Sequence, residues 1–189
     1  VLMKSDSFLL NKRMFSEKVS LYKNNRFTLE FKFKHLDFYN EIYYLRKIRK
    51  FDLLFSNVKK YTSSFLKKKK LNFSILLTND AEIKEINFKY RNLNKPTNVL
   101  SFQSMIDKNN YFKNTEQEIH LGEIIISMER IFSESKINNV LFKDHFIHIF
   151  LHAILHILGY DHEIDSERIK MEKIEISILK NLGIENPYA

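Results

Sequence analysis

The sequence predicts an α+β fold, a single domain in which a mixed sheet of about four strands is packed with helices. The chain has 189 residues, and its 44% content of hydrophobic side chains is enough to bury the core of one domain. Strand-like and helical segments are interspersed without the strict alternation that a parallel βαβ fold requires. No repeat or clear linker divides the chain. We therefore expect a domain over residues 26–189, preceded by an N-terminal arm, residues 1–25, that is disordered in part.

Four segments have the pattern or composition of strands. Residues 26–35 alternate apolar and polar side chains, as a half-buried strand does. Residues 71–79 are an apolar run of strand length, and a short strand over residues 97–102 follows Pro96. Residues 121–127, LGEIIIS, are rich in β-branched side chains and indicate a buried strand.

Helical patterns fill most of the chain between and after these strands. Asn79 or Asp80 can cap the second predicted helix, and Gly183 can end the last one. The polar connection over residues 103–120 is expected to be mobile. The predicted helices span residues 38–66, 80–90, 127–136, 143–158 and 166–182.

The composition excludes some classes of protein and favours others. The absence of cysteine excludes a disulfide scaffold and a thiolate metal site. No run approaches the roughly 20 apolar residues that span a bilayer, and the first residues lack the pattern of a signal peptide. We therefore expect a cytoplasmic protein without a membrane partner.

Positive charge is concentrated in the first part of the chain. Residues 1–75 hold 18 Lys and Arg against 6 Asp and Glu, whereas residues 76–189 hold 13 against 17. Such a basic half is typical of a protein with a polyanionic partner, RNA or DNA in most cases. Lysines that simply decorate solvent-exposed faces would give the same composition, so charge alone leaves nucleic-acid binding open.

The stretch HAILHILGYDH, residues 152–162, concentrates three of the chain's seven histidines. His152 and His156 are four residues apart, which places both imidazoles on one face of a helix. Gly159 ends that helix, so the chain can turn back and present His162. Three neutral imidazoles with one open position suit a catalytic zinc ion. The alternative is a set of hydrogen-bonded core histidines, but three unpaired imidazoles would be costly to bury. We predict one Zn²⁺ at the end of this core helix.

His145 and His148 lie on the same predicted helical face as His152 and His156. His148 is about 15 Å from the predicted helix end, at about 1.5 Å per residue. The return to His162 extends at most about 13 Å. His148 is therefore predicted to be a core residue or to support a ligand, and His145 to be exposed.

Ala153 limits the chemistry of this metal. Zinc peptidases of the H-E-x-x-H type place a glutamate general base directly after the first histidine, and here that position is Ala153. Water activated by zinc is still a nucleophile without that glutamate, because its pKa falls to about 7. Such a site suits phosphodiester cleavage if a fixed positive charge stabilises the charge that develops on the phosphate.

The stretch resembles the signature H-G-x-L-H-L-x-G-Y-D-H of the YbeY family of bacterial metal-dependent endoribonucleases. INFKYRNLNKPTNVLSF, residues 86–102, is similar to the family's L-N-x-x-Y-R…P-T-D-V-L-S-F block, and residues 121–127 to its L-G-D-I-x-I-S strand. MEKIEISIL, residues 171–179, resembles its terminal helix. The matches run in the family's order from about residue 71 to 182, and residues 1–70 match only loosely.

The resemblance implies a function and a set of site residues. His152, His156 and His162 would be the zinc ligands, and Arg91 the catalytic residue; an exposed arginine at a helix end is the alternative for Arg91. The family implies cleavage of single-stranded rRNA at the 3′ end of the small-subunit rRNA, in ribosome biogenesis, and contact with the small ribosomal subunit; no DNA substrate is expected. The basic half fits such a polyanion, and the loop Lys67–Lys70 is a candidate phosphate contact.

Other motif residues have predicted roles or depart from the family pattern. Asp161 would either orient a ligand imidazole or form a turn, and Thr97 and Ser101 would hold the strand and the turn before it. Ala153 and Glu123 replace a glycine and an aspartate. Asn98 replaces the aspartate of T-D-V-L-S-F, which would weaken activity if that carboxylate positions Arg91 or a ligand.

Two other functions stay open from the sequence. The first is a ribosome-assembly factor that binds RNA and proteins and uses the zinc only for structure. The second is a metallohydrolase of another substrate such as a peptide, against which Ala153 argues.

Overall fold

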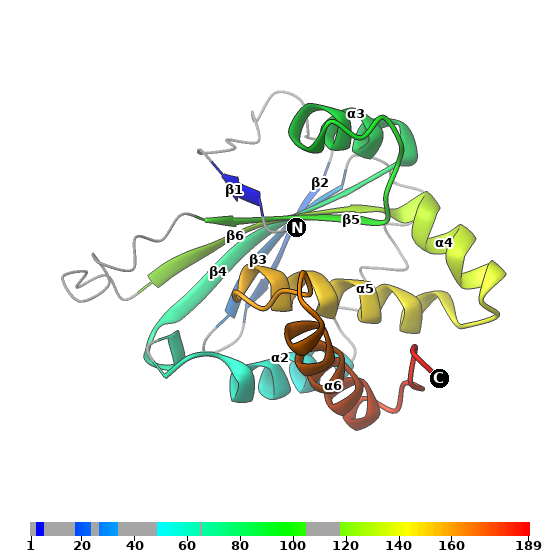
Figure 1. Ribbon diagram of the computed structural model, residues 1–189. Helices are drawn as coiled ribbons and strands as arrows, with labels where there is room; N and C mark the ends of the chain where they lie inside the picture. The colour runs from blue at the N-terminus through cyan, green and yellow to red at the C-terminus, as the bar shows by residue number, and fades with distance from the viewer. Residues whose placement is uncertain (1–2, 6–17, 24–26, 34–48, 65, 105–117) are drawn as a thin grey trace.

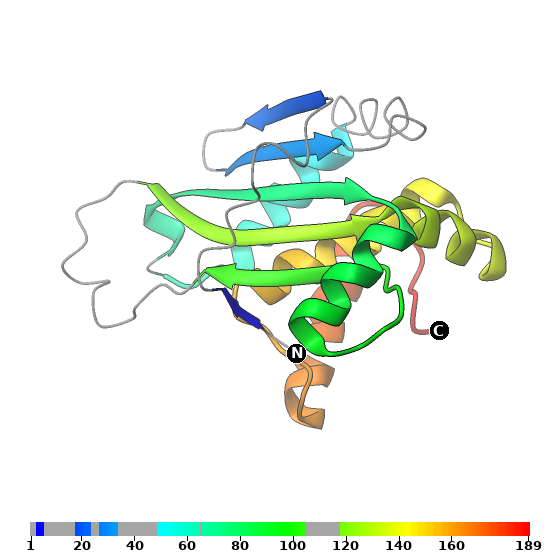
Figure 2. The same ribbon diagram turned by 90° about the horizontal axis from the view of Figure 1, so that it is seen from above.

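The centre of the computed structural model is one mixed sheet, and its described strands run in the order β1-β5-β6-β4-β3-β2 (Figures 1 and 2). Neighbouring strands are parallel in β1/β5, β3/β4 and β4/β6, and antiparallel in β5/β6 and β2/β3. The structure describes residues 3–5, 18–23, 27–33, 49–64, 66–104 and 118–189. The strands are β1 Met3–Ser5, β2 Lys18–Lys23, β3 Phe27–Phe33, β4 Lys70–Thr78, β5 Val99–Ser104 and β6 Glu118–Ser127.

The α+β class is confirmed, but the sheet is larger than predicted. The four strands expected from the sequence correspond to β3, β4, β5 and β6. The additional strands β1 and β2 fall within residues 1–25. MKS is too short to show a strand pattern, whereas KVSLYK begins with alternating polar and apolar residues, a signal that the sequence reading missed. The proposed division between an arm and a domain at residue 26 stays a prediction.

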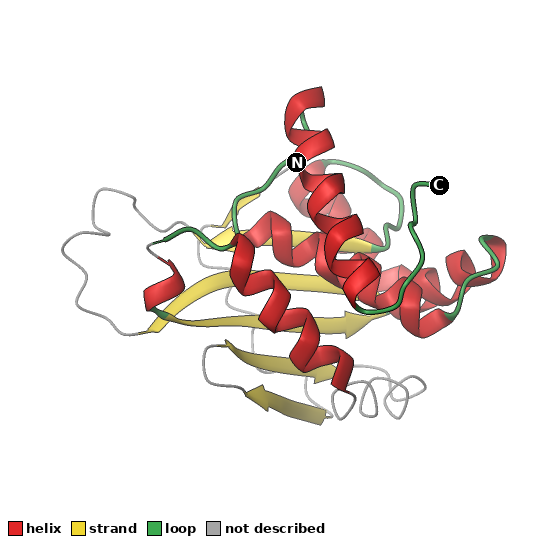
Figure 3. Cartoon of the chain, turned by 90° about the horizontal axis from the view of Figure 1, so that it is seen from below, coloured by secondary structure: helices red, strands yellow, loops and turns green. Residues whose placement is uncertain are grey.

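Helices cover both faces of this sheet. Helix α3 lies on one face, and α2, α5 and α6 lie on the other (Figures 1 and 3). Of the helix predicted over residues 38–66, residues 49–61 are helical and residues 38–48 lie outside the described part of the chain, as does most of the connection over residues 103–120. The helices are α2 Arg49–Tyr61, η2 Leu66–Lys68 (3-10), α3 Asp80–Arg91, α4 Met128–Ile137, α5 Phe142–Ile157 and α6 Asp165–Asn181.

Helix α5 is the centre of the larger hydrophobic core. Because its apolar residues surround the whole helix, it can be stable only when it is buried on most sides. Phe150 on α5 packs against Phe51 and Phe55 of α2 and against Phe73 of β4, with ring centroids 5.7–6.4 Å apart. The sheet and two helices therefore hold α5 in place, and with it the histidines near its end.

A smaller core lies between α3 and the opposite face of the sheet. It contains Ile83 and Ile86 of α3, packed with Leu100, Phe102 and other buried residues of the sheet. Since α3 is fixed here, its last residue, Arg91, is held near the start of β5. In the described part of the chain, no single helix has the length and apolarity to cross a membrane; only α4 and α5 taken together, bent by 120°, meet that test.

The close approach of β5 and β6 depends on one glycine. A Cβ atom at Gly122 would lie 2.1 Å from the carbonyl oxygen of Phe102, and the φ of Gly122 is +141°. Only glycine fits such a position without displacement of the neighbouring strand. Gly122 thus allows β5, which carries Val99 and Ser101, to pair closely with the central strands.

Candidate metal centre

The three predicted histidine ligands converge at the end of α5. His152 and His156 lie in its last turns, and Leu158 caps the helix. Gly159 follows with φ +96°, and the N–H of Tyr160 donates to the carbonyl of Leu155 at 3.0 Å. This left-handed C-terminal turn reverses the chain, as the sequence predicted. One ring nitrogen from each of His152, His156 and His162 then lies within 4.8 Å of the other two.

Glu175 on α6 fixes the orientation of His152. Its side chain is fully buried, and its Oε1 atom lies 2.8 Å from Nδ1 of His152. Because a carboxylate oxygen accepts, Nδ1 of His152 carries the hydrogen, and Nε2 keeps its lone pair for the centre of the site. A carboxylate behind a histidine ligand is the usual arrangement in zinc proteins.

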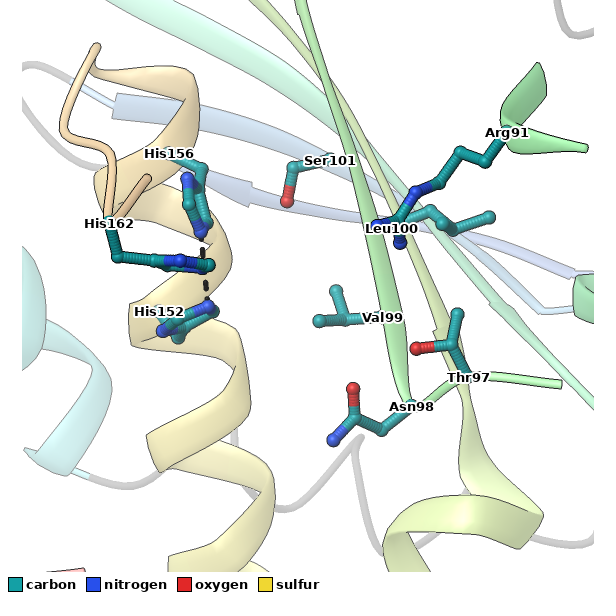
Figure 4. Close-up of a pocket in the computed structure, with 9 residues that line it drawn as sticks. All are labelled: Arg91, Thr97, Asn98, Val99, Leu100, Ser101, His152, His156 and His162. Carbon is teal, nitrogen blue, oxygen red and sulfur yellow. Dashed lines mark hydrogen bonds between the residues drawn. The ribbon is translucent and has the colours of Figure 1, made fainter. Parts of the chain in front are cut away.

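The loop after α5 fixes the orientation of His156 in a comparable way. Nδ1 of His156 lies 3.1 Å from the carbonyl oxygen of Tyr160, which can only accept. The Nε2 atoms of His152 and His156 therefore both present lone pairs, and these atoms are 3.1 Å apart (dashed line in Figure 4). Two facing lone pairs repel each other unless a cation lies between them.

A proton shared between the two rings is disfavoured. Burial lowers the pKa of His156 to about 4, and the neighbouring His152 and His162 act in the same direction. His156 is therefore neutral near pH 7, which is the form that binds a metal.

The donor set fits a divalent metal ion. Two ligands of a tetrahedral zinc ion, each at about 2.0–2.1 Å, are separated by roughly 3.3 Å, close to the distance between the two Nε2 atoms. His162 is exposed and completes a face of three nitrogens, which leaves the fourth direction open. The charge of Glu175 also points to a cation. Burial alone would raise its pKa, but His148 and His152 beside it and the Tyr188 hydroxyl outweigh burial and lower the pKa to about 2.

His148 lies behind the ligands, as predicted, whereas the prediction for His145 was wrong. Nε2 of His148 is 3.6 Å from Glu175 Oε2 and 3.4 Å from the Tyr188 hydroxyl, which itself donates to Glu175. His145 is buried, with 9% of its surface exposed, and its Nε2 lies 2.9 Å from Oε2 of Glu134 on α4. Helix periodicity alone could not show that α4 packs over this part of α5.

A pocket of about 180 Å³ opens beside the histidines, and we call it the metal pocket (Figure 4). The side chain of Arg91 extends from the end of α3 on the side of this pocket opposite the histidines. The structure thus brings together the four residues that the sequence predicted for the site. The lining is Arg91, Thr97, Asn98, Val99, Leu100, Ser101, His152, His156 and His162.

Three predictions about neighbouring residues receive structural detail. Asp161 accepts from the backbone N–H of His162 at 2.7 Å, which is the turn-forming role. Thr97 and Ser101 line the metal pocket at the start of β5, although the sequence suggested a role in holding the strand and the turn. Nδ2 of Asn98 donates to Glu134 at 3.1 Å. An aspartate at position 98 would face the Glu134 carboxylate there, so the amide suits this chain.

Sequence reasoning missed the role of Glu175, although a signal was present. Met171, Ile174, Ile178 and Leu179 form the buried stripe of α6, and Glu175 occupies a position within it. A charge inside an apolar stripe requires a partner, because an unpaired buried charge is very costly. The lysines of residues 67–70 run from η2 to the start of β4 and do not line the metal pocket, so their contact with phosphate stays a prediction.

Comparisons with known proteins identify the family of this chain. The model of the family described as "Endoribonuclease YbeY" matches residues 40–183. A protein of that name from Anaplasma phagocytophilum is 44% identical over 115 residues, 61% of this chain and 70% of the relative. Another, from Neorickettsia sennetsu, is 40% identical over 142 residues, 74% of this chain and 90% of the relative.

A solution structure of a Thermotoga maritima protein covers 71% of this chain and 81% of its own, at 23% identity and a TM-score of 0.46. That likeness is too weak to add to the family match. The match itself extends over most of the chain and includes the histidines, Arg91 and the helix that carries Glu175. The chain therefore belongs to the YbeY family of endoribonucleases, enzymes that cut RNA.

Proposed function

We propose that this protein is a zinc-dependent, single-strand-specific endoribonuclease. We infer that it acts in the cytoplasm on the 3′ end of the small-subunit rRNA and contacts the small ribosomal subunit. The observation that carries the proposal is the pair of facing Nε2 lone pairs on His152 and His156, 3.1 Å apart, in a pocket that also holds Arg91.

The protein's own residues divide the work between holding the metal and binding the substrate. When bound, zinc supplies a Lewis acid and lowers the pKa of water to about 7. Glu175 and the Tyr160 carbonyl keep His152 and His156 in the tautomer that binds metal. The guanidinium of Arg91 is always charged, and its planar fork can bind two non-bridging oxygens of a phosphate. Arg91 then stabilises the negative charge that grows on the phosphate during cleavage.

Zinc is the proposed ion because of the ligand type and number. Imidazole nitrogens suit zinc better than magnesium or calcium, which prefer oxygen ligands. Three protein ligands with an open fourth position are typical of a catalytic zinc ion, whereas a structural one has four. The exposed position of His162 and the pocket beside the ligands favour the catalytic type over a purely structural zinc.

Peptide hydrolysis is the less suitable alternative. Ala153 follows the first ligand and is fully buried in the core, so this position offers no general base for a peptidase of the H-E-x-x-H type. The ribosomal substrate and partner rest on the family resemblance. The excess of Lys and Arg in residues 1–75 supports a polyanionic partner of this kind.

The role of Arg91 is tested by Arg91→Ala. Because charge stabilisation at the transition state is lost, we expect cleavage of a single-stranded rRNA fragment to fall by about 10²–10³-fold. Zinc content, measured by elemental analysis, and the unfolding temperature should not change. The control is Arg168→Ala, which removes an exposed guanidinium on α6 outside the metal pocket. Undiminished cleavage by Arg91→Ala would remove that residue from the mechanism.

The variant His156→Ala separates an enzyme from an assembly factor with a structural zinc. For the enzyme, we expect loss of zinc, loss of cleavage and failure of rRNA maturation in cells that carry only this variant. For the assembly factor, stability would fall but maturation would continue. Normal maturation together with zinc loss would therefore contradict a catalytic metal.

A further inference from the structure

A second pocket, of about 360 Å³, adjoins the metal pocket, and we call it the cationic pocket. The two pockets share Arg91, Thr97 and Asn98 in their linings, so a chain that enters one can continue into the other. The remaining lining residues are Asn87, Leu93, Lys95, Pro96, Arg130 and Glu134.

Three cationic side chains from different elements line the cationic pocket. Arg91 ends α3, Lys95 lies in the connection between α3 and β5, and Arg130 lies on α4. The Lys95 side chain is exposed, while its backbone carbonyl accepts from Nδ2 of Asn87 at 2.7 Å. This bond fixes the connection to the buried side of α3 and leaves the ammonium group available to a ligand.

Arg130 is held in place by an ion pair and stays partly exposed. One of its terminal nitrogens, Nη2, forms an ion pair with Asp80 at 2.7 Å, and the other oxygen of Asp80 accepts from Ser127 at 2.6 Å. The Nε atom of Arg130 is buried and has no hydrogen-bond partner among the described residues. A buried donor without an acceptor is unfavourable. A ligand in the pocket does not reach this buried atom, but the Arg130 side chain as a whole is 34% exposed and presents its positive charge there.

The acidic residue in the lining does not cancel this positive charge. Oε2 of Glu134 lies 2.9 Å from His145 Nε2 and accepts from Asn98 at 3.1 Å. Its charge is therefore engaged chiefly by His145 and Asn98, and Arg130 adds a weaker attraction. With Arg130 paired to Asp80 and Glu134 paired to His145, the charges of Arg91 and Lys95 remain in the lining and favour an anion.

We propose that the cationic pocket binds the RNA phosphate next to the one that is cut. Arg91, in the wall between the two pockets, contacts both phosphates, while Lys95 and Arg130 bind only the second. This inference rests on the function proposed for the metal pocket, and it adds a subsite that positions the strand across the metal.

The test measures binding and cleavage separately with zinc-loaded protein. Anisotropy of a short, fluorescein-labelled single-stranded RNA is recorded by stopped flow before turnover, and cleavage is followed on gels. Loss of one charge-assisted contact in Lys95→Ala should weaken binding about fivefold and lower the slope of log K against log salt by about 0.7. In the cleavage assay, Lys95→Ala should raise KM and leave kcat unchanged. The matched control is Lys84→Ala, an exposed lysine of α3 outside both pockets.

A neutral linkage identifies the phosphate that is bound. Methylphosphonate is placed at one position after another along the RNA. At the position next to the cut, the wild type should lose more than fivefold, because Arg91, Lys95 and Arg130 all bind that phosphate. The loss for Lys95→Ala at this position should be about fivefold smaller than that of the wild type, because its share of the interaction is already gone. If the effects of methylphosphonate and of Lys95→Ala on affinity simply add at every position, the proposal is overturned.

Arg130→Lys provides a second variant that keeps a positive charge beside Asp80 but removes the planar guanidinium. Weaker RNA binding with an unchanged unfolding temperature supports the subsite. If the unfolding temperature of this variant falls, the comparison of Lys95→Ala with its control decides whether the subsite exists. Equal affinities and salt slopes for Lys95→Ala and Lys84→Ala would overturn the subsite even if cleavage is normal. Protein that shows the Lys95 effect on binding but cleaves no RNA would support the subsite and contradict the proposed function.

Discussion

At the scale of single residues, the metal centre depends on a side chain that binds no metal. Glu175 is fully buried, and its two oxygens serve different partners: Oε1 faces His152, and Oε2 accepts from Tyr188. Its depressed pKa means that it is ionised at neutral pH. A buried negative charge in this position makes His152 a stronger ligand and offsets part of the charge of a bound cation.

We expect Glu175→Gln to weaken zinc binding by about 10–100-fold, since the amide has nearly the same shape but no charge. Competition with a zinc chelator at constant pH measures the affinity. The control is Glu172→Gln on the same helix, where the glutamate pairs with Arg168 at 3.0 Å. Equal zinc affinity for the Glu175 variant and the wild type would show that this carboxylate is only structural.

At the scale of elements, the turn after α5 is tied to α2 by one phenol. The hydroxyl of Tyr160 donates to the backbone carbonyl of Tyr61, the last residue of α2, at 2.7 Å. Burial, followed by the influence of Tyr61, raises the pKa of Tyr160, so the hydroxyl stays protonated and remains a donor. The same residue accepts from His156 through its own carbonyl. Tyr160 therefore links the ligands on α5 to a second helix.

The variant Tyr160→Phe removes this link without a change in ring packing. We expect the free energy of unfolding to fall by about 1 kcal/mol, the usual contribution of one hydrogen bond. Zinc affinity should fall as well, because the turn that carries His162 is less ordered. Chemical denaturation and chelator competition measure the two effects.

Tyr61→Phe is the matched control for this link. It also removes a phenol hydroxyl, but one that donates to Ser177 at 3.3 Å on the surface. We expect little change in stability or zinc affinity for this variant. Identical behaviour of the two variants would mean that the hydroxyl of Tyr160 does not organise the metal centre.

At the scale of the whole molecule, the buried imidazole of His156 couples folding to pH. Its pKa is about 4 in the folded chain, against the ordinary value of 6.5 that it has once the chain unfolds. Between these values the unfolded state binds a proton that the folded state does not, so a fall in pH favours unfolding. The contribution of His156 to stability is complete above about pH 6.5 and is lost as the pH falls to about 4.

For zinc-free protein, we expect this group to lower the free energy of unfolding by about 3 kcal/mol between those two pH values. Urea denaturation at a series of pH values measures the change. His156→Gln should flatten the curve in this window, and His120→Gln, whose histidine pairs with Asn72 away from the site, should not. A curve for His156→Gln as steep as that of the wild type would assign the pH dependence to other groups.

The sequence by itself determined the local parts of this protein. The convergence of His152, His156 and His162 was predictable because they lie within eleven residues, where helix periodicity and the Gly159 turn set their geometry. The strands β3 to β6 and the helices were predictable for the same reason, since periods of two and of 3.6 residues are short-range signals. Arg91 was found through its motif, because its distance from the histidines along the chain excludes any inference from spacing.

Only the tertiary structure decided the contacts between residues that are far apart in the sequence. It placed Glu175 behind His152, buried His145 against Glu134, added β1 and β2 to the sheet and joined the metal pocket to the cationic pocket. These contacts depend on how whole helices and strands pack, and a pattern within one segment carries no information on which distant segment will cover it. The arrangement of the three histidines was therefore readable from eleven residues, whereas the groups that orient them and the second pocket required the complete fold.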